Sequence, residues 1–387
     1  MPGVHARLSA SSAARWINCP PSALLAEQFT DTQSPYAAAG TLAHAIAELK
    51  ARKHFLEPMG PRKYAAAMKK LKGDPAYEPG MDAATEAYLD HLKAIALNFP
   101  EKPFVALEVR VDYSDYAPRG FGTADCIMIY GDTIHIVDYK NGSGVPVDAL
   151  ENPQLQLYAL GALKVYAPFY GDKLTEIHVH IVQPNAGGVR SWYLDRNALI
   201  EWGEKVVRPA AELAYDGKGD FCPGPWCDDH FCPARATCAA RAKKMLGYTA
   251  YTSKDPALLD NDEIAGILEI AGNLHKWLTA VQDYAFNEAL AGRKISGFKL
   301  VEGRRSREWL DQDKAFEALR DRGVAEALLW ERKPVTVAGL EKLLGKAGFA
   351  AASDGLVLQK PGKPALVPES DRRPEWTPAN AAFEVVD

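Results

Sequence analysis

The chain has 387 residues, of which 47% are hydrophobic and 25% are charged, and its formal net charge at pH 7 is -5. This length allows one large domain with an appendage, or two domains, and the apolar content allows a substantial core. The slightly negative charge excludes a general attraction to polyanions, so any contact with nucleic acid must come from local basic patches.

The first hundred residues are predicted to be mostly helical. Apolar residues recur at helical spacing over residues 9–29, 40–53 and 82–96, and a basic stretch punctuated by Gly and Pro, residues 60–80, separates the last two. No segment of the chain approaches the roughly 20 consecutive apolar residues that span a bilayer, and the N-terminal sequence lacks an export signal. We therefore expect no membrane partner and a cytoplasmic location.

Strand patterns follow. FVALEVRVDY, TADCIMIY and TIHIVDYK are short and rich in β-branched residues, and Gly131-Asp132 joins the last two as a hairpin. A helix is expected to open at Pro153 and continue to about residue 165. Two further strands, EIHVHIVQP and VRSWYLD, and a helix over residues 196–215 complete the pattern. The order predicts an α/β fold in which helices flank a mixed β-sheet.

The sequence texture changes near residue 250, where we place a boundary between a first domain, 1–250, and an accessory region, 251–387. Residues 255–291 are predicted to form an amphipathic helix, and ISGFKLVEGRRSREW is predicted to form a basic strand or hairpin. From about residue 358 the chain is Pro-rich, which is typical of an extended tail. The second region is therefore expected to be an α+β appendage.

Two charged side chains emerge together at the end of an apolar strand. In TIHIVDYK, strand alternation places Asp138 and Lys140 on one face with two isoleucines, and burying such charges without partners is costly. Pairing across the hairpin brings Asp125 near Asp138. Two carboxylates suit a hard divalent cation such as Mg²⁺, and a neighbouring lysine can stabilise charge that develops on a phosphate. The pattern predicts metal-dependent phosphodiester hydrolysis.

These residues resemble those of a known superfamily. GTAD at residues 122–125, VDYK at 137–140 and QLQLY at 154–158 resemble the GxxD, (D/E)xK and QxxxY motifs of PD-(D/E)XK nucleases, the last being typical of the RecB-like and CRISPR-associated exonucleases. GTLAH at residues 40–44 resembles the GxxxH helix of the same branch. The resemblance implies a restriction-endonuclease-like core and a Mg²⁺- or Mn²⁺-dependent DNA exonuclease.

The same resemblance assigns roles to individual residues. The residues that it assigns are the metal ligands His44, Asp125 and Asp138, the catalytic Lys140, and Gln154 and Tyr158 beside the DNA. Glu48, four residues after His44, is predicted to orient the imidazole as an outer partner of the metal site. Glu108, on the preceding strand, either assists the site or faces water.

Four of the six cysteines lie within residues 222–238, spaced C-x4-C-x4-C-x5-C in a segment rich in Pro, Gly and Asp. In a reducing compartment such crowding indicates a metal, and four cysteines can hold zinc unaided. RecB-like exonucleases of the AddB and CRISPR-associated kinds instead hold a [4Fe-4S] cluster, with one cysteine before the core and three after it. The ligands that the resemblance implies, with Cys222 spare, are Cys19, Cys227, Cys232 and Cys238.

The densest basic segment is interleaved with aromatic residues, a combination that suits single-stranded DNA, although a solvated hairpin would look the same. Its basic residues are Arg293, Lys294, Lys299, Arg304, Arg305 and Arg307. Residues 60–72 form a second, weaker basic candidate.

The whole chain also resembles an uncharacterised phage and prophage family. This implies a role in phage DNA replication or recombination in the bacterial cytoplasm, with DNA ends or single strands as substrate and a single-strand-binding protein or a recombinase as partner. Two rival functions stay open. One is a non-catalytic DNA-binding or recombination-accessory protein on a nuclease scaffold, and the other is a component of virion assembly.

Overall fold

A computed structural model of the chain describes residues 6–29, 35–247, 261–301, 311–330, 335–353, 356 and 357. The chain divides into two compact units, residues 1–288 and 289–387, and each is described by itself. This division differs from the boundary that sequence texture places near residue 250. Helix α11 (Asn261–Leu290) accounts for the difference, because it lies almost wholly in the first unit, where Lys276 forms an ion pair with Asp229 at 3.2 Å.

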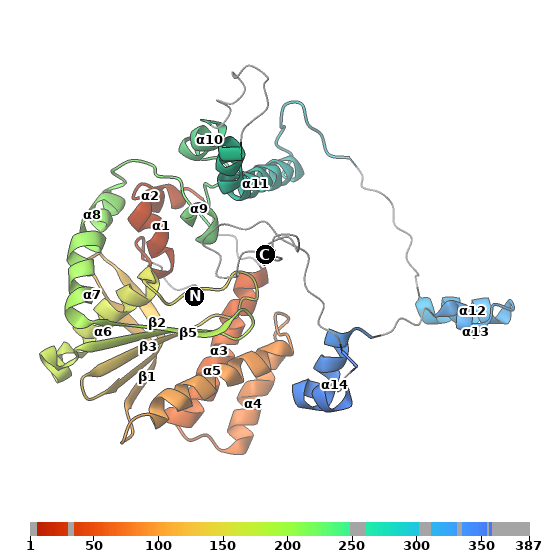
Figure 1. The fold of residues 1–387 in the computed structure, drawn as a ribbon, viewed down its shortest axis with the longest axis horizontal. Helices are drawn as coiled ribbons and strands as arrows, with labels where there is room; N and C mark the ends of the chain where they lie inside the picture. The colour runs from red at the N-terminus through yellow and green to blue at the C-terminus, as the bar shows by residue number, and fades with distance from the viewer. Residues whose placement is uncertain are drawn as a thin grey trace, which may run out of the picture. The chain divides into compact units, whose positions relative to one another are not determined.

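The first unit contains a five-stranded mixed sheet in the order β1-β2-β3-β4-β5 (Figure 1). The strands are β1 (Phe104–Asp112), β2 (Phe121–Tyr130), β3 (Thr133–Tyr139), β4 (Glu176–Gln183) and β5 (Gly188–Asp195). All neighbours are antiparallel except β3 and β4, which are parallel. A parallel pair needs a crossover, and helix α6 (Pro153–Tyr170) provides it. The predicted α/β architecture with a mixed sheet is confirmed.

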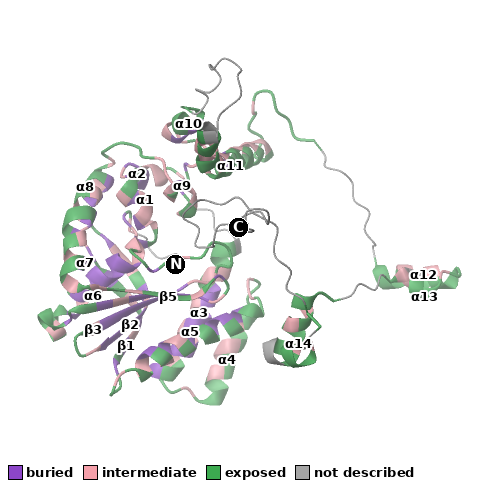
Figure 2. Ribbon diagram, viewed as in Figure 1, coloured by how far each residue is buried: buried purple, intermediate pink, exposed green. Residues whose placement is uncertain are grey.

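Helices cover both faces of the sheet (Figure 1). One face packs against α6 and a layer of shorter helices: 3-10 turn η1 (Ala10–Ser12), α1 (Ala13–Asn18), α2 (Ser22–Ala26), α7 (Arg196–Trp202), π-helical turn η3 (Gly203–Val207) and α8 (Arg208–Asp216). The other face packs against α3 (Pro35–Phe55) and α5 (Gly80–Leu97). Figure 2 shows the buried residues concentrated in the sheet and on the helix faces that meet it.

The central strand β3 is apolar on both sides. Ile134 and Ile136 pack toward α6, whereas Val137 and Tyr139 pack toward α3 and α5. The same alternation continues on β4, so both faces of this parallel pair are enclosed, as parallel strands require. One consequence is that a polar side chain on either strand is unusual and needs a partner.

Helix α6 begins where the sequence predicts. The side chain of Asn152 accepts hydrogen bonds from the backbone N–H groups of Gln154 and Leu155, and Pro153 occupies the first turn, where a missing N–H costs nothing. Gly161 allows the helix to approach β1, because a Cβ there would lie 2.9 Å from Cβ of Val111. The Asn152 cap fixes where α6 begins, and the close approach at Gly161 holds the helix against the sheet.

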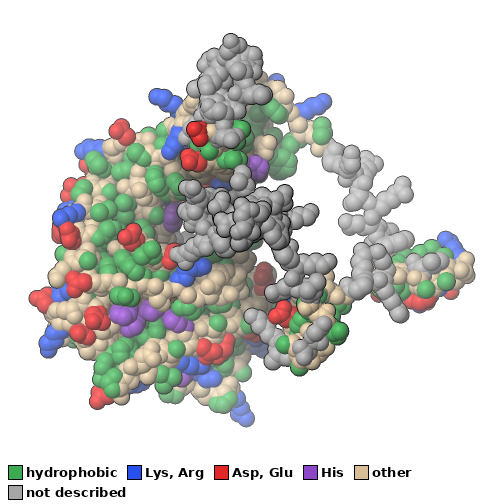
Figure 3. Space-filling model, viewed as in Figure 1, with side chains coloured by type: hydrophobic (Ala, Val, Ile, Leu, Met, Phe, Trp, Pro, Cys, Tyr) green, Lys and Arg blue, Asp and Glu red, His purple; other side chains and the backbone are tan. Residues whose placement is uncertain are grey.

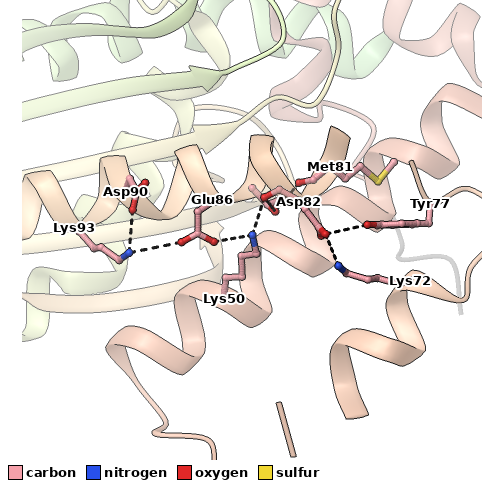
Figure 4. Close-up of polar contacts among 9 residues, drawn as sticks. Lys50, Lys72, Tyr77, Met81, Asp82, Glu86, Asp90 and Lys93 are labelled. Atoms are coloured by element: carbon pink, nitrogen blue, oxygen red, sulfur yellow. Dashed lines mark hydrogen bonds and ion pairs between the residues drawn. The ribbon is translucent and has the colours of Figure 1, made fainter. Parts of the chain in front are cut away.

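A network of ion pairs ties α5 to α3 and to α4 (Pro61–Lys72), a helix in the basic stretch that the sequence pattern had not identified as helical (Figure 4). Lys50 of α3 is 7% exposed, and its Nζ lies 2.8 Å from both Oε2 of Glu86 and the carbonyl oxygen of Asp82. Asp82 also binds Lys72 and accepts a hydrogen bond from the Tyr77 hydroxyl at 3.0 Å. Lys50 is the buried centre of this network.

Replacing Lys50 by methionine is expected to lower the free energy of unfolding by about 1–3 kcal/mol, because it leaves the Asp82 carbonyl and Glu86 without their buried donor. Lys93 is the matched control, since it is 31% exposed and lies 3.8 Å from the same Glu86. Its methionine variant should lose no more than about 1 kcal/mol, as is usual for exposed pairs. Urea unfolding of both variants measures the difference, and equal losses would contradict the prediction.

The described part of the second unit is helical and contains no strand. Its helices are α12 (Gln312–Asp321), α13 (Glu326–Leu329) and α14 (Val337–Ala352). Of the predicted basic strand or hairpin, residues 295–301 form no strand and residues 302–309 lie outside the described residues, as does the Pro-rich tail. Among the described helices of the chain, none combines the length and apolar character that crossing a membrane requires.

Candidate active site

Strands β2 and β3 stop pairing at the point where each strand carries an aspartate. Their pairing ends at Cys126 and Val137, and the next residue on each strand is an aspartate, Asp125 and Asp138. Oδ2 of Asp125 accepts a hydrogen bond of 2.7 Å from the backbone N–H of Tyr139. The carboxylate therefore takes the place of a ladder contact and is held at the opening between the strands.

Glu108 of β1 lies beside this opening and has a left-handed backbone conformation, with φ of 51°. The face of the sheet to which β1 directs its side chains switches here: Leu107 packs toward α3 and α5, whereas Val109 and Val111 pack toward α6. A non-glycine residue with positive φ is strained, and such strain is found preferentially at functional sites. Strand alternation alone could not predict where Glu108 points.

Three side chains from three elements converge at this level. His44 of α3, Glu108 of β1 and Asp125 of β2 each offer a ligand atom, and these atoms all lie within 4.8 Å of one another. Nδ1 of His44 is 3.3 Å from Oδ1 of Asp125, and the imidazole meets the Tyr139 ring edge-on at 5.4 Å between centroids. The arrangement offers one nitrogen and two carboxylates to a cation.

The electrostatics of this trio favour the binding of a cation. Desolvation, followed by repulsion from Asp125 and Glu48, raises the pKa of Glu108 to about 7. Burial lowers the pKa of His44, but the Asp125 carboxylate outweighs that effect and the net shift is upward. A divalent cation would relieve the repulsion among the carboxylates, so the donor set fits a metal.

Asp138 and Lys140 form an ion pair at the end of β3, with Oδ2 and Nζ 2.9 Å apart. The Asp138 side chain is 3% exposed and that of Lys140 is 27% exposed. Burial raises the pKa of Asp138, and Lys140 opposes the shift, whereas the pKa of Lys140 is raised because Asp138 outweighs its own desolvation. Oδ2 of Asp138 is buried, and the Lys140 ammonium group is its close partner among the described residues.

Gln154 joins the ion pair to Tyr158. Oε1 of Gln154 accepts a hydrogen bond from Lys140 at 3.1 Å, and Nε2 donates to Oδ1 of Asp138 at 3.2 Å and to the Tyr158 hydroxyl at 3.1 Å. Residues 154 and 158 are one helical turn apart, so α6 presents both from one face. The amide fixes the relative positions of the carboxylate and the ammonium group.

Gly122, the first residue of GTAD, makes room for Tyr158, because a Cβ at this position would lie 2.7 Å from Cε1 of the ring. We expect Gly122→Ala to displace Tyr158 and with it Gln154, and to lower any catalytic rate by about 10- to 100-fold with little loss of fold. Gly80→Ala is the control, since a Cβ at Gly80 meets nothing within 4 Å. The rates of both variants on the substrate proposed below test this, and equal rates would contradict it.

Glu48 lies near enough to Glu108 to raise the pKa of that carboxyl group, but in the described part of the chain it does not contact His44 as predicted. Glu48 forms an ion pair of 2.5 Å with Arg52, and the described contacts include no hydrogen bond from Glu48 to His44. Arg293, Lys294 and Lys299 are exposed residues of the second unit. The remaining three basic residues of that segment, Arg304, Arg305 and Arg307, lie outside the described residues.

The cysteines predicted as ligands come together from both ends of the first unit. Cys19, Cys227, Cys232 and Cys238 line one small cavity, whereas Cys222 is exposed, with its backbone N–H 3.4 Å from Sγ of Cys19. Burial raises the pKa of the Cys19, Cys227 and Cys232 thiols. Cys126, in contrast, is fully buried in the core beside β3, as expected of a structural cysteine.

An arginine lies in the wall of the same cavity. Burial lowers the pKa of Arg15, against the opposing influence of the Cys232, Cys19 and Cys227 thiols, and its Nε is buried without a hydrogen-bond partner among the described residues. No three of the cysteine Sγ atoms, all of which are described, lie within 4.8 Å of one another. Tetrahedral zinc, with Zn–S of about 2.3 Å, would bring them to roughly 3.8 Å. Zinc at this place would therefore require the thiols to move closer together.

Comparison with known proteins gives a family and two structural similarities. A family model described as "Protein of unknown function (DUF2800)" matches residues 5–374. "Crystal Structure of LHK-Exo in complex with dAMP" is 13% identical with a TM-score of 0.23, over 46% of this chain and 92% of that chain. "Crystal structure of SSO0001" is 15% identical with a TM-score of 0.23, over 51% and 85%. Both TM-scores are low, so a functional conclusion depends on the geometry of the site.

Proposed function

The chain belongs to the DUF2800 family, and we propose that it is a nuclease that hydrolyses phosphodiester bonds of DNA with the help of a divalent metal ion. One observation carries the proposal: the ligand atoms of His44, Glu108 and Asp125 converge beside the buried Asp138–Lys140 ion pair at the end of β3. This is the environment that a PD-(D/E)XK nuclease needs, and Glu108 extends the set of ligands predicted from the sequence.

The proposed roles follow from these contacts. His44, Glu108, Asp125 and Asp138 would hold Mg²⁺ or Mn²⁺, which when bound lowers the pKa of a coordinated water and neutralises charge on the scissile phosphate. Lys140, partly exposed, presents its ammonium group to the nucleophile or to the developing oxyanion. Gln154 keeps the ammonium and the carboxylate in register, and Tyr158 fixes the amide.

We further propose that the substrate is a DNA end or a single strand, in phage replication or recombination, and that the exposed basic residues Arg293, Lys294 and Lys299 contact the phosphates. A non-catalytic scaffold would not need a buried carboxylate paired with a lysine beside a second set of ligands, because such groups are costly without a task. The site therefore favours an enzyme over the rival functions.

The purified full-length chain should degrade labelled linear DNA when Mg²⁺ or Mn²⁺ is present and stop when EDTA is added. Linear and circular single strands, and duplexes with blocked or free ends, distinguish exonuclease from endonuclease action: circular and end-blocked DNA should survive. DNA binding without cleavage under every metal condition would contradict the enzyme and favour the scaffold, and the absence of both binding and cleavage would favour an assembly component.

We also propose that Cys19, Cys227, Cys232 and Cys238 hold a [4Fe-4S] cluster. Two observations support it: the four residues line one cavity, and Arg15 places a positive charge in the wall. When bound, the cluster would join the N-terminal helices to the segment after the core, a chiefly structural role.

A further inference from the structure

Four histidines from three elements gather on the α5 side of the sheet, away from the face that carries Asp138. Parallel pairing of β3 and β4 sets His135 opposite His178, and strand alternation directs His180 to the same side. His91 of α5 reaches them from the helix layer, with Nε2 3.3 Å from Nδ1 of His180. Figure 3 shows histidine side chains gathered at the surface over the sheet.

The ring nitrogens are close enough to share one ion. His135, His178 and His180 each offer a nitrogen, and these atoms all lie within 4.8 Å of one another. Nδ1 of His135 and Nε2 of His180 are 2.9 Å apart. Ligand atoms around a tetrahedral ion with metal–nitrogen bonds of about 2.0–2.1 Å are separated by roughly 3.4 Å. Small movements of the side chains would therefore complete the coordination.

The protonation states suit metal binding. Burial, reinforced by the neighbouring imidazoles, lowers the pKa of His135 to about 4 and that of His180 to about 2, and burial also lowers the pKa of His91. A neutral imidazole has a lone pair to offer to a metal ion. Nδ1 of His180 lies 2.8 Å from the Ser191 hydroxyl, which can orient the ring from outside.

The histidine cluster also lines a surface pocket, and Glu176 offers it a further ligand atom. A surface pocket is lined by the four histidines, Glu176 and residues of α5. The His178 side chain is 31% exposed, and its Nε2 lies 3.6 Å from Oε2 of Glu176. Histidines that serve only packing are not expected to line an open pocket beside a carboxylate.

We propose that His135, His178 and His180 bind a borderline divalent transition-metal ion such as Zn²⁺, with Glu176 or water completing the coordination. Imidazole ligands suit such ions, whereas Mg²⁺ takes oxygen ligands. The site is separate from the proposed catalytic centre and does not depend on nuclease activity. It would clamp β3 to β4 and so hold the strand that ends in Asp138 and Lys140.

Co²⁺, a spectroscopic substitute for Zn²⁺, tests this site on the full-length chain after chelator treatment under reducing, anaerobic conditions. We expect tightly bound cobalt with the visible bands of a nitrogen and oxygen site and without the thiolate charge-transfer absorption that the cysteines would give. His178→Gln should weaken this binding by more than the roughly 10- to 100-fold that loss of an outer partner costs. His54→Gln, at an exposed histidine of α3, should leave it unchanged.

Asp125→Asn keeps the test independent of the catalytic centre, because the cobalt bands should survive that substitution. Equal cobalt affinity and bands in His178→Gln and in the unchanged protein would overturn the proposal. A second measurement needs no variant: Zn²⁺ should protect His178 from diethyl pyrocarbonate at least about tenfold, as read by peptide mass. Unchanged modification of His178 in the presence of Zn²⁺ would also overturn it.

Discussion

Lys140→Met is expected to lower the rate of metal-dependent DNA hydrolysis by at least about 10³-fold, because it removes the group that can stabilise charge on the phosphate or its nucleophile. The loss has a second cause. Lys140 is the ion-pair partner of Asp138, 2.9 Å away, and without it the upward shift that burial gives the pKa of Asp138 has less to oppose it. A carboxyl group binds a metal in its deprotonated form, so a higher pKa weakens metal binding.

The control for this substitution is Lys164→Met. Lys164 also pairs with carboxylates, Asp112 at 3.4 Å and Asp115 at 2.7 Å, but its side chain is 37% exposed and lies outside the site. Initial rates on end-labelled DNA and circular dichroism of both variants separate catalysis from folding. If folded Lys140→Met protein degraded DNA at the unchanged rate, the assignment of the site would be wrong.

Asp138→Asn extends the test, because the amide keeps the shape of the side chain while removing a charged ligand. The rate should fall as far as in Lys140→Met. Affinity for Mn²⁺, followed by calorimetry on the metal-free protein, should fall with it, whereas Lys140→Met should retain more of that affinity. The two variants thus distinguish loss of the metal from loss of the lysine's own contribution.

The sequence can place the residues at the centre of this candidate site near one another because their contacts are local. Asp138 lies in β3, Lys140 directly follows that strand, and Asp125 lies across a two-residue hairpin, so alternation and register bring them together without knowledge of the rest of the fold. Gln154 and Tyr158 are one turn apart on a helix that begins at Asn152 and Pro153. The helical periodicity and the N-cap are enough to predict that these two side chains lie on one face of the helix.

The positions of Glu108 and of the histidine cluster could not be predicted from such local patterns. Glu108 reaches the site through a backbone conformation with positive φ, which a strand pattern does not reveal. His135 and His178 become neighbours only through parallel pairing of strands that are separated by helix α6. The motif HVH in β4 signals two histidines on one face, but only the tertiary register supplies the third.

Cys232→Ser is expected to remove iron and to destabilise the first unit. Cys232 is buried in the cavity wall, and serine is a poor ligand for iron, so iron should fall from about four per chain to near zero, with loss of visible absorption. The cluster would close a loop of about 200 residues between Cys19 and Cys227. By analogy with a covalent cross-link, its loss should lower the free energy of unfolding by up to about 5 kcal/mol.

Cys222→Ser tests whether Cys222, which lies near the four proposed ligands, is itself a ligand. Cys222 is exposed and meets Sγ of Cys19 through its backbone N–H, which serine retains, so iron content and stability should stay unchanged. Iron lost from Cys222→Ser but kept in Cys19→Ser would contradict the ligand set. Zinc bound at the cysteines, with no iron and no visible absorption, would contradict the cluster itself.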